Sequence, residues 1–344
     1  MRATFLKNSS FIISSGLISD DAEEQAEAGA ELELRALVFG ETQHGVRLDR
    51  ALVELVPEFS RSYLQQLIDL DAVKINGQVV RKAASRVKAS DVGTIELRPT
   101  PQSQAFKPET MALDVVFEDE YLMVINKPVG LVVHPAPGNW SGTLLNGLLA
   151  YGPEFLNMPR AGIVHRLDKD TSGLMVVART RPVMDALIKA IAAREVGRQY
   201  LALANRTWVG ARHREVNEPI GRDPRNRLRM AVVDLEKHQG KPAKTEIDLI
   251  QNGASGCLVR CTLHTGRTHQ IRVHMASIGH PLVADEVYGG SKAAGMQRQA
   301  LHAYRLAFTH PSTNKLLEFK SNLPPDFELA LREWGLSYNE SNEP

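Results

Sequence analysis

Short apolar runs, bounded by polar residues and glycine, dominate the chain from about residue 113 onward. Runs of this kind that are rich in β-branched residues are typical of buried strands. We expect strands at residues 115–117, 122–125, 131–133, 174–177, 199–204, 246–250 and 257–263. Apolar residues at helical spacing predict helices at residues 143–150, 182–194, 268–278 and 325–334. Because strands outnumber helices and do not alternate regularly with them, the pattern predicts an α+β fold with a mixed, largely antiparallel sheet.

A smaller α/β pattern precedes this region. Residues 47–56 carry apolar positions on one helical face, and Ser60 is placed to cap a second helix. An Asn-Gly pair between two β-branched runs predicts a hairpin at residues 73–80, and residues 92–97 supply a further strand. Two helices and a short sheet therefore form a separate module.

Changes in composition divide the chain into five parts. Residues 1–40 are acidic and lack a large apolar face, so we expect a disordered tail there. The small module spans residues 41–98, and the proline-containing stretch 99–110 is a linker. The large domain spans residues 111–337, followed by a tail at 338–344.

The net charge of +1 conceals an asymmetry, because residues 1–35 hold seven acidic side chains against three basic ones. The rest of the chain is therefore +5, which suits a polyanionic partner without requiring one. Cys257 and Cys261 have no zinc-binding spacing and share a face of one strand, so we expect reduced core residues. Reduced cysteines are typical of a cytoplasmic protein, which is the localisation that we expect. No apolar run approaches ~18 residues, so we expect no membrane span.

The chemistry-bearing stretch is Gly162–Arg179. Its two apolar ends, 162–164 and 174–177, predict strands that flank His165–Ser172, which is dense in charge and hydroxyl groups. Strands on both sides would hold such a cluster rigidly. A polar hairpin turn with a purely structural role is the alternative that the residues alone leave open.

Residues 165–174, HRLDKDTSGL, resemble the central motif of the RluA-type pseudouridine synthases. Three further segments are similar to motifs of that family and stand in the family order, at Ile125–Pro135, Arg194–Ala202 and Leu263–His274. The resemblance extends over most of residues 113–335. It implies an RNA-modifying isomerase that uses no cofactor.

The resemblance also implies roles for individual residues. The catalytic aspartate falls on Asp168, Arg272 is the cation that keeps this carboxylate ionised, and Tyr200 stacks on the base near C5. Breaking the N1–C1′ bond and rejoining the base through C5 requires an ionised carboxylate near the sugar. Arg166 would fill the gap left by the extruded uridine. The other expected substrate-binding residues are His165, Thr171, Ile271, Arg222 and Arg225.

Each of these residues has a less specific interpretation. Tyr200 could be a core residue of an apolar strand, Arg272 a surface ion-pair residue, and the arginines between Arg198 and Arg229 ordinary loop charges. His269 and His274 are five apart, which is not the spacing of a helical zinc pair, so we expect no metal site. The sequence departs from the family pattern at Ala284, where glycine is usual, and at Arg198, where lysine is frequent.

The small module resembles the S4 RNA-binding domain over residues 44–98, in the order RLDRAL, SRS and VKINGQVV. A generic α/β module with a solvated basic surface is the alternative. The resemblance implies RNA contacts by basic residues, for which the candidates are Arg47, Arg50, Arg61, Arg81 and Lys82.

Within the family, the whole chain is most similar to the branch that modifies large-subunit (23S) ribosomal RNA at the intersubunit-bridge stem-loop. We therefore expect ribosomal RNA as partner, within a pre-ribosomal large subunit, and a monomeric enzyme. A synthase for another ribosomal or transfer RNA uridine is one alternative, and a non-catalytic RNA-binding assembly factor is another. An Asp/His hydrolase is disfavoured, since the sequence has no nucleophile elbow.

Overall fold

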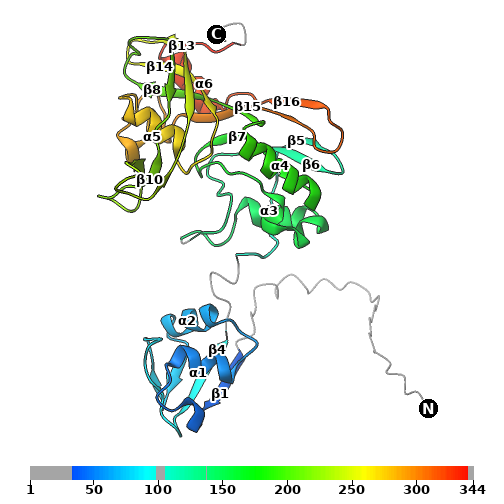
Figure 1. Cartoon of the computed structure of the whole chain (residues 1–344), viewed down its shortest axis with the longest axis vertical. Coiled ribbons are helices and arrows are strands. Elements are labelled where there is room, and N and C mark those ends of the chain that lie inside the picture. The colour runs from blue at the N-terminus through cyan, green and yellow to red at the C-terminus, as the bar shows by residue number, and fades with distance from the viewer. Residues whose placement is uncertain (1–32, 98–104, 137, 340–344) are drawn as a thin grey trace, which may run out of the picture. The chain divides into compact units, whose positions relative to one another are not determined.

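The computed structural model describes residues 33–97, 105–136 and 138–339. The chain divides into two compact units between residues 100 and 101, and each is described by itself (Figure 1).

The first unit is a four-stranded antiparallel sheet with two helices. Its sheet has the order β1-β4-β2-β3. The Ser60 hydroxyl accepts a hydrogen bond from the Tyr63 amide and caps the second helix, as predicted. Asn76 and Gly77, both at positive φ, form the predicted hairpin turn. The elements are β1 Glu33–Val38, α1 Leu48–Leu55, α2 Arg61–Asp69, β2 Val73–Ile75, β3 Gln78–Val79 and β4 Val92–Leu97.

The expectation of a disordered tail up to residue 40 is wrong for residues 33–40. Strand β1 pairs with β4 along its whole length, from Glu33 opposite Leu97 to Val38 opposite Val92. Leu37 and Phe39 are buried in the core of the unit. An isolated strand with one apolar face cannot be separated from a tail by composition, because its partner β4 follows more than fifty residues later. Residues 1–32 lie outside the described residues.

The second unit is built on a nine-stranded sheet with the order β5-β6-β7-β15-β8-β14-β13-β9, and β16 pairs with β15. Every pair is antiparallel except β7 with β15, so the predicted mixed, largely antiparallel sheet is confirmed. The strands are β5 Val115–Glu118, β6 Leu122–Lys127, β7 Ser172–Ala178, β8 Gly197–Asn205, β9 His213–Val216, β13 Thr245–Asn252, β14 Gly256–Leu263, β15 Leu301–Thr309 and β16 Leu316–Lys320. A separate small sheet contains β10 Ile220–Arg222, β11 Met230–Val232 and β12 Gly240–Lys241.

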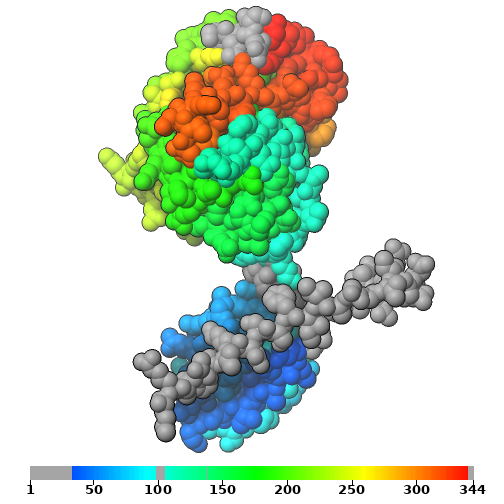
Figure 2. Space-filling model, turned by 90° about the vertical axis from the view of Figure 1, so that its right-hand side faces the viewer, coloured from blue at the N-terminus to red at the C-terminus, as the bar shows by residue number. Residues whose placement is uncertain are grey.

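Successive side chains of a strand point to opposite faces of the sheet, so alternate residues of the large sheet pack in different hydrophobic cores. On β8, Tyr200 and Ala202 join the core that includes helices α3 (Leu144–Tyr151) and α5 (Gln270–Ser277), whereas Leu201 joins the core of α6 (Pro325–Glu333). Helix α4 (Arg181–Ala193) packs on a third core with Leu174 and Val176 of β7. Figure 2 shows the orange surface of β15–β16 against the cyan surface of the β5–β6 region. The Phe117 and Phe319 rings, 5.3 Å apart, join these segments.

Three expectations for this unit need correction. Residues 131–133 are loop rather than strand, because the carbonyls of Val132 and Val133 accept from the first amides of α3. Residues 162–164 are not a strand either: Ile163 makes one isolated bridge to Val177. Gly162, at a φ of 75°, lies so close to the Ala178 carbonyl that a Cβ would come within 1.9 Å of the oxygen.

The third correction concerns the boundaries of the unit. Residues 105–110 were expected to belong to the linker, but the Asn146 side chain donates to the carbonyls of Ala105 and Lys107. At the other end, Tyr338 packs on Tyr304 with ring centroids 5.6 Å apart, so the expected tail begins too early. Residues 98–104 and 340–344 lie outside the described residues.

Candidate active site

One large cavity, of about 920 Å³, lies in the second unit at the end of β7 and β8. The described residues that line it include six arginines and four histidines, but one carboxylate, that of Asp168. Such a lining attracts anions, since the low-dielectric walls focus the positive field. The arginines are Arg160, Arg166, Arg194, Arg198, Arg267 and Arg272.

Asp168 sits in the loop that leads into β7, and buried side chains from distant segments hold that loop. Lys127 at the end of β6 donates from Nζ to the Lys169 carbonyl at 2.9 Å, and also to the carbonyls of Pro128 and Leu131. Arg298 donates to the Asp170 carbonyl at 2.9 Å while its other donors engage Asp326 of α6. Lys127 and Arg298 thus fix the carbonyl groups of the two residues that directly follow Asp168. Burial lowers the pKa of Lys127 to about 8, opposed by the charges of Asp170 and Asp168.

Arg272 of α5 is the direct partner of Asp168. Its Nη1 donates to Asp168 Oδ2 at 3.1 Å, whereas Nε and Nη2 donate to Asp285 at 2.7 and 2.9 Å. Its guanidinium lies over the Tyr288 ring, 5.0 Å from the centroid. Although burial acts in the opposite direction, the bonds to Asp285 and Asp168 raise the pKa of Arg272. The guanidinium therefore stays charged beside the carboxylate.

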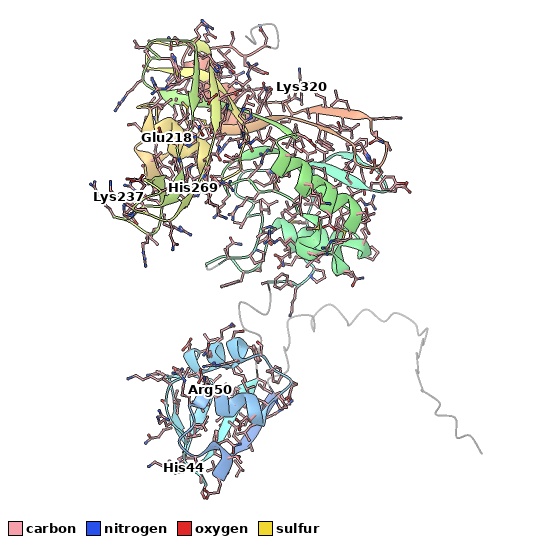
Figure 3. The ribbon with its side chains drawn as sticks, in the orientation of Figure 1. His44, Arg50, Glu218, Lys237, His269 and Lys320 are labelled. Atoms are coloured by element: carbon pink, nitrogen blue, oxygen red, sulfur yellow. The ribbon has the colours of Figure 1, made fainter. Side chains whose placement is uncertain are left out.

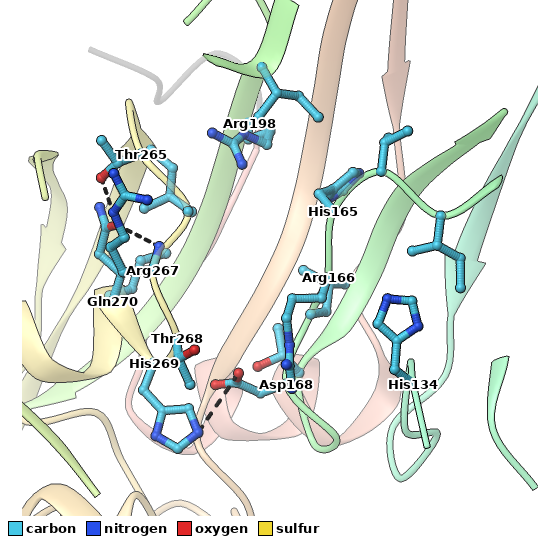
Figure 4. Close-up of a pocket in the computed structure, with 18 of the residues that line it drawn as sticks. His134, His165, Arg166, Asp168, Arg198, Thr265, Arg267, Thr268, His269 and Gln270 are labelled. Carbon is cyan, nitrogen blue, oxygen red and sulfur yellow. Dashed lines mark hydrogen bonds and ion pairs between the residues drawn. The ribbon is translucent and has the colours of Figure 1, made fainter. Parts of the chain in front are cut away.

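His269 closes the other side of Asp168. Its Nε2 is 3.9 Å from Asp168 Oδ1 (Figure 4), which is too long for a hydrogen bond. Its Nδ1 is 2.8 Å from the Tyr288 hydroxyl. His269 has a φ of 57°, a left-handed conformation that is costly for a residue with a side chain. Burial lowers the pKa of His269, opposed by the charge of Asp168.

Tyr200 lines the same cavity from β8 and is buried. Burial raises the pKa of its phenol to about 12, so the hydroxyl carries its proton at neutral pH. Its ring offers an aromatic face, and its hydroxyl a hydrogen-bonding group, to the cavity.

The structure brings most of the predicted substrate-binding residues to this cavity but not all. His165, Arg166, Thr171 and Ile271 line it. Arg222 and Arg225 do not: they lie on β10 and the hairpin loop after it. That hairpin is tied to the site indirectly, because the Met230 amide donates to the Tyr288 hydroxyl at 3.1 Å.

Three residues that the sequence did not single out support the surroundings of Asp168, and they lie outside the motifs that predicted the catalytic residues. They are Asp285, Tyr288 and Arg298. Asp285 and Tyr288 follow Ala284, whose φ of 58° is a left-handed conformation that favours glycine. The role of Arg298 could not be predicted from its neighbours in the sequence, because a single arginine in a loop is common. Only the fold shows that it reaches the Asp170 carbonyl.

The histidines do not assemble a metal site among residues 33–97, 105–136 and 138–339, where no three potential ligands converge. The His274 ring is engaged by the Thr245 hydroxyl at 2.8 Å and the Glu218 carbonyl at 3.0 Å. Cys257 and Cys261 are both buried thiols in the core, as expected. No helix within the described part of the chain is long and apolar enough to cross a membrane.

Basic residues of the first unit fall into two groups. Arg47 and Arg61 both donate to the buried carboxylate of Asp49, and Arg81 pairs with Asp71. Arg50 on α1 (Figure 3) and Lys82 are exposed, and no ion pair is recorded for either among the residues described. The latter two are the better candidates for RNA contacts, since their charges are not already neutralised.

Comparison with known proteins agrees with this geometry. Residues 121–277 match the family described as RNA pseudouridylate synthase, and residues 46–92 match the S4 domain. The ribosomal large subunit pseudouridine synthase D of Neisseria meningitidis serogroup B is 45% identical over 341 residues, which cover 94% of this chain and 89% of that protein. The chain belongs to the RNA pseudouridylate synthase family.

Other members extend the comparison. The ribosomal large subunit pseudouridine synthase D of Yersinia pestis is 44% identical over 311 residues, covering 86% of this chain and 93% of that protein. Among solved structures, human RNA pseudouridylate synthase domain containing 1 aligns with a TM-score of 0.51 at 25% identity, covering 65% of this chain and 90% of that one. The cavity around Asp168 therefore lies in the catalytic domain of an RNA pseudouridine synthase, preceded by an S4 domain.

Proposed function

We propose that this synthase isomerises uridines of large-subunit (23S) ribosomal RNA in the intersubunit-bridge stem-loop, with Asp168 as catalytic carboxylate. The observation that carries the catalytic assignment is that Asp168 is the one carboxylate among the described residues lining a cavity rich in arginine. The target follows from relatives named for the large ribosomal subunit that match over most of their length. The partner we propose is the RNA within a pre-ribosomal large subunit, bound by a single copy of the enzyme.

The reaction breaks the N1–C1′ bond and forms a C5–C1′ bond, while the proton on C5 is lost and N1 gains one. Asp168 either adds to C1′ or removes the C2′ proton, and both routes use its ionised form. Arg272, which donates to one oxygen of Asp168, stabilises that form and leaves the other oxygen toward the cavity.

Tyr200 and Arg166 complete the proposed site. The buried Tyr200 ring supports the base as it turns, and its hydroxyl exchanges the proton at C5. Arg166, exposed at the cavity, occupies the space that an extruded uridine leaves in the RNA. His165, Thr171 and Ile271 line the remainder of the nucleotide-binding surface.

The test is to map pseudouridine in 23S rRNA, 16S rRNA and tRNA transcripts incubated with the full-length enzyme. Carbodiimide-dependent stops of reverse transcription locate each new pseudouridine. We expect stops confined to the bridge stem-loop of 23S rRNA. Stops in tRNA or elsewhere in rRNA instead would contradict the target, although not the activity.

Asp168→Asn is the matched control for the catalytic assignment. It keeps the volume and removes the charge, so turnover should fall by more than about 1,000-fold while RNA affinity persists. Turnover within tenfold of the wild type would refute the role of Asp168.

A further inference from the structure

Arg198 is a buried cation that the proposed mechanism does not use. It lies on β8 two residues before Tyr200, so both side chains project to the same face of the sheet. It is 5% exposed, and its Nε has no hydrogen-bond partner among the described residues. Figure 4 shows it across the cavity from Asp168.

The other buried arginines differ from Arg198 because each has a carboxylate partner. Three arginines are buried among the described residues: Arg198, Arg272 and Arg298. Arg272 is held by two carboxylates and Arg298 by Asp326, whereas no ion pair is recorded for Arg198 within the described ranges. An arginine cannot give up its charge, and burying that charge without an anion is costly. Burial lowers the pKa of Arg198 accordingly.

His165, on the facing loop, is a second buried donor without an acceptor. The Val176 amide donates to His165 Nε2 at 3.1 Å, so the proton of the neutral ring is on Nδ1. Burial, assisted by the charge of Arg198, lowers the pKa of His165 to about 3, which keeps the ring neutral. His165 Nδ1 has no partner within the described structure. Arg198 and His165 both line the cavity that Asp168 lines.

Gly266 provides the space for the guanidinium. A Cβ on this residue would lie 3.0 Å from Arg198 Nη1, a contact tighter than nearly all real ones. Its backbone is not in the left-handed region, so alanine is conformationally allowed there. The position therefore offers a way to displace the guanidinium without removing it.

We propose that Arg198, with His165 beside it, binds a phosphate of the RNA backbone next to the target uridine. A phosphate supplies both the negative charge that Arg198 lacks and several acceptor oxygens, arranged for a guanidinium fork. Two residues along a strand span about 7 Å, so the phosphate would lie next to a base stacked on Tyr200. A uracil carbonyl could accept the same hydrogen bonds but would leave the buried charge uncompensated.

This inference rests on the RNA substrate of the proposed function, and the first experiment combines activity with stability. Arg198→Met should leave the enzyme at least as stable as the wild type, because it removes an uncompensated buried charge. Its kcat/KM on the stem-loop should fall about 10- to 100-fold, the cost of one charge-assisted contact. Gly266→Ala should lower kcat/KM in the same direction, and Arg198→Lys should be milder than Arg198→Met. A destabilised Arg198→Met enzyme whose activity returns in full when it is kept folded at lower temperature would overturn the proposal.

The second experiment identifies the phosphate. Stem-loops carrying one neutral methylphosphonate at each linkage around the uridine are converted by the wild type, by Arg198→Met and by Arg198→Lys. At one linkage the neutral group should slow the wild type about tenfold or more and leave Arg198→Met unaffected. Equal slowing of both enzymes at every linkage would mean that Arg198 does not contact phosphate, and would overturn the proposal. Wild-type conversion of the unmodified stem-loop is the control: its absence would count against the proposed target instead.

Discussion

Each unit contains a carboxylate that is bound by arginine, but the ratio of arginines to carboxylates is reversed between the two units. In the S4 domain, Arg47, Arg61 and Gln65 all donate to Asp49, whose side chain is completely buried. In the catalytic domain, Asp168 and Asp285 share the single guanidinium of Arg272. Two arginines serve one carboxylate in the first unit, and two carboxylates share one arginine in the second.

The difference separates a carboxylate that stabilises its domain from the carboxylate that we propose to be catalytic. Hydrogen bonds from Arg47, and then from Arg61 and Gln65, hold the pKa of Asp49 far below its ordinary value, against the effect of burial. Five side-chain hydrogen bonds from described residues of the same domain reach its two oxygens. From the described residues the Asp168 carboxylate accepts one hydrogen bond, at Oδ2, and the side chain remains 17% exposed at the cavity. A carboxylate that keeps unused lone pairs facing a cavity can react, whereas a saturated one can only stabilise the fold.

The largest effect should come from Arg272→Met. This change leaves Asp285, whose side chain is 1% exposed, without its ion-pair partner, and it removes the hydrogen bond that Asp168 Oδ2 accepts. We expect the free energy of unfolding to fall by about 3–5 kcal/mol, with a severe loss of turnover. Denaturant unfolding and single-turnover kinetics on the stem-loop measure the two effects.

Arg272→Lys separates charge from geometry at this position. The point charge survives but the fork is lost, so stability and turnover should both lie between the wild type and Arg272→Met. An Arg272→Met enzyme as stable and active as the wild type would mean that the shared guanidinium has no role in the site.

The next effect should come from Asp285→Asn. Without the second carboxylate, Arg272 loses the two bonds at 2.7 and 2.9 Å that orient it toward Asp168. We expect kcat to fall about tenfold or more with little change in KM, because the variant misplaces a charge without touching RNA. A change confined to KM would place Asp285 in RNA binding instead.

Asp49→Asn should affect stability and not chemistry. Arg47 and Arg61 are 43% and 45% exposed and can return to water, so the loss should be modest, about 1–2 kcal/mol of local unfolding free energy. Hydrogen exchange of the full-length chain would show faster exchange in the S4 domain alone. Asp71→Asn, which removes an exposed pair with Arg81, is the matched control and should cost less than about 0.5 kcal/mol.

The stabilising effect of Asp49 should depend on pH. Because the folded-state pKa of Asp49 is depressed, its stabilising contribution is present in full above the unfolded pKa and is lost as pH falls through the folded value. The stability difference between wild type and Asp49→Asn should therefore be constant above about pH 5 and shrink below about pH 4. A difference that does not change with pH would show that the ionised carboxylate is not what matters.

The smallest effect should come from Arg50→Gln. Arg50 is exposed, with no ion pair recorded in the described structure, so its charge is available to RNA phosphates. We expect RNA affinity to fall a few fold and the slope of log K against log salt to drop by about 1, with stability unchanged. An unchanged slope would exclude Arg50 from the RNA interface.

Local sequence determined the elements and the chemistry-bearing motif. Ser60, Asn76 and Gly77 act through residues within a few positions, so cap and hairpin follow from spacing alone. The apolar periods likewise fixed most strands and helices. The predictions for residues 33–38, 131–133 and 162–164 were wrong. The hydrogen-bond partner that sets the conformation of each segment lies far along the chain or at the end of a helix.

Only the tertiary structure decided how charges are shared. Arg272 lies 104 residues from Asp168, and Arg298 lies 128 residues from Asp170, so neither contact has a local signal. The sequence also gives Arg47, Arg61, Arg198 and Arg272 the same chemistry. Their surroundings differ because the packing of the whole domain sets how far each arginine is buried and which carboxylate lies next to it. Arg47 and Arg61 pair with a buried carboxylate, Arg272 is shared by two, and Arg198 has no recorded ion pair among the described residues.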